Sequence, residues 1–138
     1  SSLVGIHGLY GYSAYAPSKF ALRGLSDVLR YELKPYGIQV SVVFPSDTIT
    51  PQLDYENKHK PPILKALSES NTKPVSAESV AEKTIRAIKR GKYMILPSSD
   101  GVMWFIAYSL LPGDIMYRMV DLLMVQARRK AGKDIAGK

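Results

Sequence analysis

Three side chains near the start of the sequence have the types and spacing for proton transfer at a carbonyl group. Tyr15 and Lys19 form a Tyr-x-x-x-Lys pair where a helical pattern begins, and Ser2 lies upstream of them. A four-residue spacing places the phenol and the ammonium on one helix face, within reach of one ligand. The ammonium favours phenolate over phenol, so the phenol can give up a proton near neutral pH, and a serine hydroxyl can donate to a carbonyl oxygen. Together they predict reduction of a ketone by a hydride from another source.

The sequence around this pair is a stronger indication of function than the pair itself. Two common residues at this spacing also recur by chance on solvated helix faces. Residues 1–19, SSLVGIHGLYGYSAYAPSK, resemble the active-site segment of the short-chain dehydrogenase/reductase family. The shared features are an upstream serine, a glycine-rich loop and a serine before the lysine: Ser2, Gly5, Gly8, Gly11 and Ser18. The resemblance implies that Ser2, Tyr15 and Lys19 are catalytic and that Tyr15 and Lys19 also lie at the cofactor.

A second candidate segment follows an apolar run at residues 38–44. In open α/β sheets, ligands bind beyond the carboxyl ends of the strands. Residues 45–50 occupy that place and resemble the family's Pro-Gly-x-Val-x-Thr segment, which holds the nicotinamide carboxamide. The resemblance implies four cofactor-binding residues: Pro45, Ser46, Thr48 through its backbone and Thr50 through its hydroxyl. Ser46 replaces the usual glycine, and a polar loop without a ligand is the alternative interpretation.

A helix and a strand after the tyrosine must position these residues. Leucines recur at helical spacing over residues 13–36, and Pro35-Tyr36-Gly37 is expected to end this helix. Gly24 inside it favours close packing, which is compatible with a homodimer through helix 13–36. Residues 38–44 are β-branched and mostly apolar, which predicts a strand in a buried parallel sheet. Helix followed directly by strand predicts the α/β class with a doubly wound parallel sheet.

Residues 1–101 are expected to form one unit, the C-terminal half of a Rossmann-like reductase domain, with its catalytic segment at residues 1–50. A dinucleotide-binding fold begins with a strand, a glycine-rich turn and a helix that together hold the pyrophosphate. The sequence does not contain this pattern. We therefore expect the chain to be the C-terminal half of a longer enzyme, without the phosphate-binding part of its cofactor site.

Two further segments complete this unit. Residues 51–74 are polar and contain proline, and they correspond to the substrate-binding loop of the family. Ser76 is a capping residue, and an amphipathic helix is expected to run from it to Arg90, followed by a strand at residues 92–97. The buried face of that helix is expected to hold Val80, Ala81, Thr84, Ile85 and Ile88.

Residues 102–138 depart from a generic reductase, because they predict two apolar helices and a basic tail. The longest apolar run is about 11 residues, whereas a helix needs about 20 to cross a bilayer. Two interpretations stay open. The helices pack into a core or a subunit interface, or they form a membrane-associated anchor whose aromatic and basic side chains meet the lipid surface. The side chains of such an anchor would be Trp104, Tyr108, Tyr117, Arg128, Arg129 and Lys130.

Composition narrows the remaining classes of partner. The chain has 138 residues, no cysteine and a formal net charge of +7. His7 and His59 lie far apart without ligand-like spacing, so we expect no metal site. The positive charge suits an anionic membrane surface or a phosphorylated cofactor. No nucleic-acid motif accompanies it, so we expect no nucleic-acid partner.

Several segments narrow the resemblance to one group of the family, the 3-ketodihydrosphingosine reductases. They are residues 15–25, 32–36, 44–51 and 99–101. This resemblance implies NADPH as the cofactor and a long-chain keto-lipid as the substrate, reduced at its 3-keto group. It also implies a membrane-associated enzyme whose active site faces the cytosol, at the endoplasmic reticulum in a eukaryote. The alternatives are a soluble reductase for a steroid or acyl ketone and an inactive fragment.

Overall fold

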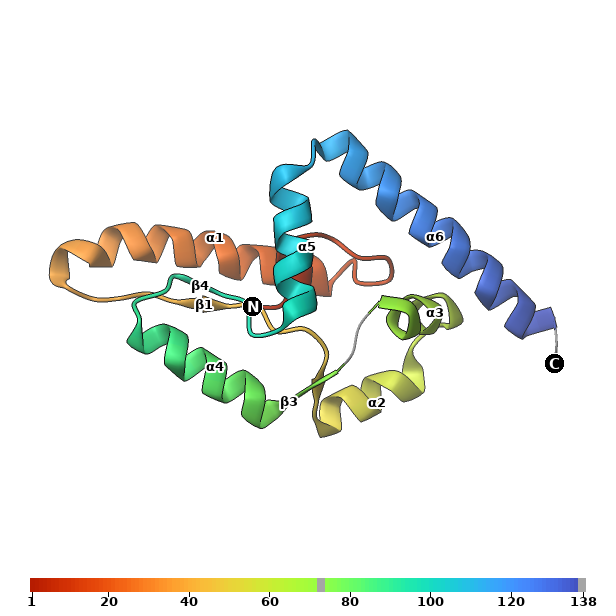
Figure 1. Ribbon diagram of the computed structural model, residues 1–138, viewed down its shortest axis with the longest axis horizontal. Coiled ribbons are helices and arrows are strands. Elements are labelled where there is room, and N and C mark those ends of the chain that lie inside the picture. Colours follow the sequence, from red (N-terminus) through yellow and green to blue (C-terminus); the bar gives the residue numbers. More distant parts are fainter. Residues whose placement is uncertain (72–73, 137–138) are drawn as a thin grey trace.

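The structure, a computed structural model, describes residues 1–71 and 74–136, and for residues 68–71 and 133–136 it describes the backbone alone. Helices dominate, and four short strands lie between them (Figure 1). The elements in chain order are η1 (Leu3–Gly5), α1 (Tyr15–Leu33), η2 (Lys34–Tyr36), β1 (Val42–Val43), β2 (Thr48–Ile49), α2 (Pro51–His59), α3 (Pro62–Asn71), β3 (Val75–Ser76), α4 (Ala77–Lys89), β4 (Met94–Ile95), α5 (Ser99–Leu110) and α6 (Gly113–Ala136).

The strands form two parallel pairs. β1 pairs with β4, with Val42 opposite Met94, and β2 pairs with β3, with Thr48 opposite Val75. Helix α1 lies on one side of the β1–β4 pair and α4 on the other (Figure 1). Parallel strands covered by helices agree with the predicted α/β class.

The strands are shorter than the sequence predicts. Of the run predicted at residues 38–44, only Val42 and Val43 are in β1, and within the described residues β4 is its sole partner. Ladder hydrogen bonds define a strand, and here they run from the Val42 amide to Tyr93 and from the Phe44 amide to Ile95. The β2–β3 pair was not predicted, because its two-residue strands carry no periodic pattern of their own.

The buried core joins the start of the chain to the strands. Ile6, Val42 and Phe44 are buried together, and Phe44 has no exposed surface. Phe105 and Tyr108 of α5 pack against this cluster. The loop that carries Ser2 is therefore anchored on β1 from one side and on α5 from the other.

Helix α1 matches the predicted helix at residues 13–36, with η2 as its last, tighter turn. Gly37 ends it with a left-handed backbone (φ 72°), and the Gly37 amide donates to the Lys34 carbonyl. A glycine adopts this conformation at little cost, which explains the sharp stop. Further back on α1, Asp27 accepts a 2.6 Å hydrogen bond from the Tyr93 hydroxyl, which ties the helix to the segment before β4.

The segment at residues 51–74, predicted as a loop, is mostly helical. The Thr50 hydroxyl accepts from the Leu53 amide and caps α2, with Pro51 in the first turn. Pro62 likewise opens α3. Both prolines stand in the first turn of a helix, where proline is favoured, and the assignment of this segment to substrate binding stays a prediction.

Helix α4 begins after Ser76, whose hydroxyl caps it as predicted, but its apolar face is less buried than expected. Ile85 is 54% exposed and Ile88 is 45% exposed, and Ala81 is exposed as well. Val80 and Thr84 are half-buried. A helical pattern shows which side chains share a face, whereas burial depends on what covers that face, and no other described element does so at Ile85 and Ile88.

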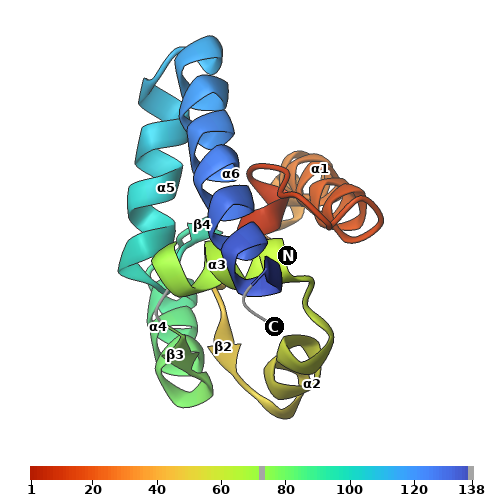
Figure 2. The ribbon, with the colours of Figure 1, turned by 90° about the vertical axis from the view of Figure 1, so that its right-hand side faces the viewer.

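Helices α5 and α6 diverge from the turn that joins them (Figure 1), and α6 packs mainly on α3 (Figure 2). Both predicted helices are present, and α6 continues past Lys130 to Ala136. Within residues 1–71 and 74–136, no helix combines the length and the apolar character that crossing a bilayer requires.

Candidate active site

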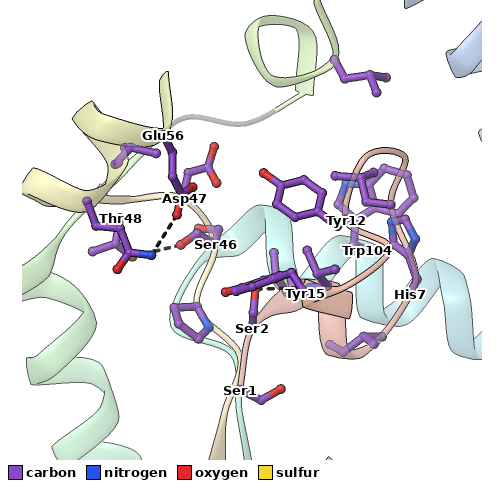
Figure 3. A pocket seen from close by; sticks show the side chains of 18 of the residues that line it. Ser1, Ser2, His7, Tyr12, Tyr15, Ser46, Asp47, Thr48, Glu56 and Trp104 are labelled. Carbon is purple, nitrogen blue, oxygen red and sulfur yellow. Dashed lines mark hydrogen bonds between the residues drawn. The ribbon is translucent and has the colours of Figure 1, made fainter. Parts of the chain in front are cut away.

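The described residues enclose a cavity of about 340 Å³ between the start of the chain, the segment after β1, and helices α2, α3, α5 and α6. Figure 3 shows this cavity from close by. Ser2 and Tyr15 lie on its wall, as do Pro45, Ser46, Thr48 and Thr50. Six of the seven predicted site residues therefore meet at one cavity. The seventh, Lys19, lies behind Tyr15 on α1.

Ser2 and Tyr15 are held together by close contact between the loop and α1. A Cβ atom at Gly5 would lie 2.8 Å from the Lys19 carbonyl oxygen, so only glycine lets the loop approach the helix this closely. The Ser1 hydroxyl donates to the same carbonyl at 2.9 Å. The Ser2 oxygen accepts from the Val4 amide, which leaves the Ser2 hydroxyl hydrogen available for a ligand.

Tyr15 is the first residue of α1, and Lys19 follows one turn later. The Lys19 Nζ atom lies 4.9 Å from the centroid of the Tyr15 ring. Pro17 is accepted in this first turn because its missing amide hydrogen would have no helical partner there. Tyr15 is 38% exposed, so its hydroxyl is accessible to a ligand in the cavity.

The segment after β1 lines the wall beside Tyr15 (Figure 3). The Ser46 Oγ atom is buried and has no hydrogen-bond partner within the described residues. Thr48 donates to the Ser46 carbonyl at 2.9 Å, and Thr50 donates to the Thr48 carbonyl at 3.3 Å while it caps α2. A buried hydroxyl without a partner needs a polar group, and a carboxamide would supply one.

Two carboxylates and a second tyrosine extend the polar wall. Asp47 and Glu56 line the cavity, and Asp47 lies 3.7 Å from the Nζ atom of buried Lys60. Glu56 accepts a hydrogen bond from Gln52. Burial raises the pKa of Tyr12, and the negative charges of Glu56 and Asp47 raise it further. None of the three was singled out from the sequence as a site residue, and Glu56 on α2 is indistinguishable there from a carboxylate on a solvated helix face.

The opposite wall is apolar and comes largely from the C-terminal helices. Its side chains are Leu9, Leu67 of α3, Trp104 of α5, and Val120, Leu123 and Met124 of α6. The Trp104 ring lines the cavity 5.2 Å from the His7 ring, and the residue is partly exposed. This wall is not predictable from the sequence, since no local pattern shows that α6 lies over the same cavity as residues 1–15.

The site fits the nicotinamide end of a dinucleotide and not its phosphates. Ser46 and Thr48 offer hydroxyl and backbone groups beside Tyr15. Within the described residues, no strand runs through a glycine-rich turn into a helix with the spacing that holds a pyrophosphate. The described residues also contain no group of three or more His, Asp or Glu side chains that could hold a metal ion.

Comparison with known proteins matches the chain to one family of dehydrogenases and reductases. Residues 1–61 match the short chain dehydrogenase family. The chain is 52% identical over 95 residues to the 3-ketodihydrosphingosine reductase of Dictyostelium discoideum, which covers 69% of this chain and 28% of that protein. It is 47% identical over 104 residues to the 3-dehydrosphinganine reductase of Danio rerio (75% and 31%). A 3-ketodihydrosphingosine reductase of Cryptococcus neoformans is 33% identical over 148 residues (93% and 43%).

The chain thus spans less than a third of the length of the first two of these relatives. No solved structure matches it significantly. The family match includes Ser2, Tyr15, Lys19 and the segment at residues 45–50. The chain belongs to the short-chain dehydrogenase/reductase family, and within it is similar to the 3-ketodihydrosphingosine reductases.

Proposed function

We propose that this chain is the catalytic part of an enzyme that reduces the 3-keto group of 3-ketodihydrosphingosine to a hydroxyl. The observation that carries the proposal is the meeting of Ser2 and Tyr15 on one cavity wall, with Lys19 beside the Tyr15 ring. Relatives with 43–52% identity over about 100 residues have names that state this activity.

In the proposed reaction, Tyr15 donates a proton to the substrate oxygen. Its position at the start of α1 presents the hydroxyl to the cavity. Ser2 donates a hydrogen bond to the same oxygen, which orients the carbonyl and stabilises the charge that develops on it. Lys19, one turn behind Tyr15, supplies positive charge beside the phenol. A bound nicotinamide would supply the hydride, and the protein contributes orientation and electrostatics.

We propose NADPH as the cofactor. Lys19 would bind the nicotinamide ribose together with Tyr15. Pro45, Ser46, Thr48 and Thr50 would hold the carboxamide, and the buried Ser46 hydroxyl without a partner supports a polar group at this point. The phosphate end would lie on a further part of a doubly wound sheet, joined to the β1–β4 pair.

The charge of the cavity favours a sphingoid base over the alternative substrates. The carbon beside the 3-keto group of such a base carries an amino group, which is cationic near neutral pH. Glu56 and Asp47 line the same polar wall as Ser2 and Tyr15, and one of them, Asp47, is partly neutralised by Lys60. Opposite charges attract at short range in a partly enclosed site. A steroid or a simple acyl ketone offers no such cation.

The test compares 3-ketodihydrosphingosine with its N-acetyl derivative, which has the same ketone and chain but no positive charge. Full-length protein that contains this chain is assayed for NADPH oxidation with each substrate. We expect turnover of the free base and a kcat/KM at least about ten-fold lower for the neutral derivative. Turnover of steroid ketones without turnover of the free base would favour the soluble-reductase alternative.

We further propose that α1 forms a homodimer contact and that the C-terminal helices bind an anionic membrane surface on the cytosolic side. Leu25 and Val28 on α1 are 54% and 50% exposed, an apolar surface that a second copy would cover. Sedimentation equilibrium of the protein and of a Leu25→Glu variant tests the dimer.

On α5, Met103 and Leu110 are 68% and 77% exposed, which suits insertion at the depth of the lipid headgroups.

A further inference from the structure

Three of the six side chains of the apolar wall come from α6, a helix that lies outside residues 1–61, the part of the chain that matches the short chain dehydrogenase family. One stripe of α6 faces inward, with residues three and four positions apart. At its ends, Met116, Ala127 and Ala131 are 2–5% exposed. In its middle, Val120, Leu123 and Met124 line the cavity. The ends of the stripe thus pack against protein, while its middle faces open space.

The packing at the end of the stripe fixes α6 over the site. Ala127 and Ala131 are one turn apart, and α6 has its main contacts with α3. Small side chains allow two helices to approach closely. On α3, Leu64 and Ala66 are buried, while Leu67 lines the cavity beside the α6 side chains. The wall is therefore supported by a packed helix pair and does not depend on a loose tail.

Trp104 links this wall to the catalytic segment. Its ring lies 5.2 Å from the ring of His7, which is five residues from Ser2. The indole therefore lies beside the loop that carries Ser2, and it lines the same cavity as Val120, Leu123 and Met124. An amphiphile in the cavity would place its keto group at Tyr15 and its hydrocarbon on the opposite side.

We propose that Trp104, Leu67, Val120, Leu123 and Met124 form the binding surface for the hydrocarbon chain of the substrate, so that α6 determines chain-length specificity. This inference rests on the proposed function, since it takes the substrate to be a long-chain keto-lipid. The occupant is the alkyl chain itself, because the surface is apolar and continuous with the wall that carries Ser2 and Tyr15. Each methylene removed from water on this surface strengthens binding by about four-fold.

Trp104 is the single tryptophan of these 138 residues, so the emission that a Trp104→Phe variant of the full-length protein loses reports occupancy of the wall. The probe is dihydrosphingosine, the product, which binds without reaction, in an 18-carbon and an 8-carbon form below their micellar concentrations. The signal is the difference between the protein and its Trp104→Phe variant. We expect the 18-carbon form to shift the Trp104 emission to shorter wavelength and to bind at least about 100-fold more tightly than the 8-carbon form.

Two neighbouring leucines give a matched pair of variants. Leu123 lines the cavity, whereas Leu122 is 64% exposed on the outer face of the same helix. Glutamine suits a helix at either position. Leu123→Gln is expected to weaken binding of the 18-carbon probe about ten-fold or more and the 8-carbon probe much less, while Leu122→Gln changes neither. Val120→Phe, which keeps the wall apolar and only narrows the cavity, is expected to weaken the longer probe selectively.

The outcomes separate this inference from the proposed function. If the protein reduces 3-ketodihydrosphingosine but Trp104 emission does not respond to the probe, the wall assignment is wrong and the function stands. Equal weakening by Leu123→Gln and Leu122→Gln also overturns the assignment, since it would indicate adsorption to exposed apolar surface. If the probe binds with the expected variant pattern but no ketone is reduced, the wall stands and the proposed function fails.

Discussion

The Nζ atom of Lys19 lies 4.9 Å from the centroid of the Tyr15 ring, one helical turn further along α1. The ammonium is therefore near enough to act on the phenol electrostatically. Tyr15 lines the cavity while Lys19 stands behind it. The tasks proposed for the two side chains differ, and substitution can distinguish them.

Replacing Tyr15 with phenylalanine keeps the ring and removes only the proton donor. We expect kcat for 3-ketodihydrosphingosine to fall by about 10² or more, in line with the usual contribution of general acid catalysis. The Kd for NADPH should change little. Steady-state kinetics and a fluorescence titration measure the two quantities. Tyr10→Phe, at a 45% exposed tyrosine of the loop before α1, is the control. Turnover like that of the unmodified protein in Tyr15→Phe would contradict the catalytic role.

Replacing Lys19 with methionine keeps the length of the side chain and removes its charge. Because Lys19 is proposed both to support Tyr15 and to bind the nicotinamide ribose, kcat should fall and the Kd for NADPH should rise, each by about ten-fold or more. Lys34→Met, at an exposed lysine after the same helix, should alter neither. A loss of kcat with unchanged cofactor affinity would limit Lys19 to the first task.

His7 gives the fold a dependence on pH. Burial lowers the pKa of its imidazole, and the hydrogen bond with the Gly8 carbonyl acts in the opposite direction. Below about pH 6.5, the unfolded chain binds a proton that the folded chain still excludes, so the free energy of unfolding falls as the pH drops from there to the lowered pKa of the folded state. Urea unfolding between about pH 7.5 and about pH 5 measures this slope.

The variant His7→Phe should lose the part of this slope that His7 contributes, because it has no proton to bind in either state. His59→Phe, which replaces an exposed imidazole at the end of α2, should retain it. An unchanged slope in His7→Phe would show that other groups cause the acid sensitivity.

The hydrogen bond between Tyr93 and Asp27 should contribute measurably to stability. Tyr93→Phe removes a 2.6 Å bond to a carboxylate and should lower the free energy of unfolding by about 1.5–3 kcal/mol. Burial and the bond to Asp27 raise the pKa of Tyr93 to about 12, so its contribution is complete below pH 10 and is lost as the pH rises toward 12. Tyr31→Phe, at a 67% exposed tyrosine, is the control, and equal effects of both changes would contradict the assignment.

Membrane binding should depend on the basic residues near the end of α6. We expect the protein to pellet with anionic vesicles at low salt and to be partly released at high salt, because exposed cations attract anionic headgroups by about 1 kcal/mol each. Arg128→Gln with Arg129→Gln should reduce pelleting. Lys89→Gln with Arg90→Gln removes the same charge from the end of α4 and should not. If the unmodified protein stays in the supernatant at low salt, membrane binding is wrong.

The sequence predicts those features that local chemistry determines. The helix from Tyr15 ends at Gly37, since glycine adopts the left-handed backbone conformation that terminates a helix. Ser76 caps α4 through its hydroxyl, as its residue type indicates. The short-chain dehydrogenase resemblance at residues 1–19 and 45–50 led to six residues that line one cavity, although their roles stay predictions.

The features that the sequence does not predict depend on contacts between distant segments. β2 and β3 are two residues each and exist because Thr48 and Val75 meet. The apolar side chains of α6 have the same pattern whether they face a core, a lipid or a cavity. Only the packing of α6 on α3 shows that Leu123 faces the site and Leu122 does not.

Helix α6 is apolar on two of its sides. Leu123 and Met124 face the cavity, while Leu122 and Val125 are 64% and 44% exposed on the outside. A helix with its side chains is about 10 Å across, so only this thickness separates the cavity from the outer surface of α6. A lipid that moves around α6 from a bilayer to Tyr15 would travel a short path between two apolar environments, the bilayer interior and the apolar wall of the cavity. Its chain would cross little water, and delivery of the substrate would not require its full solvation.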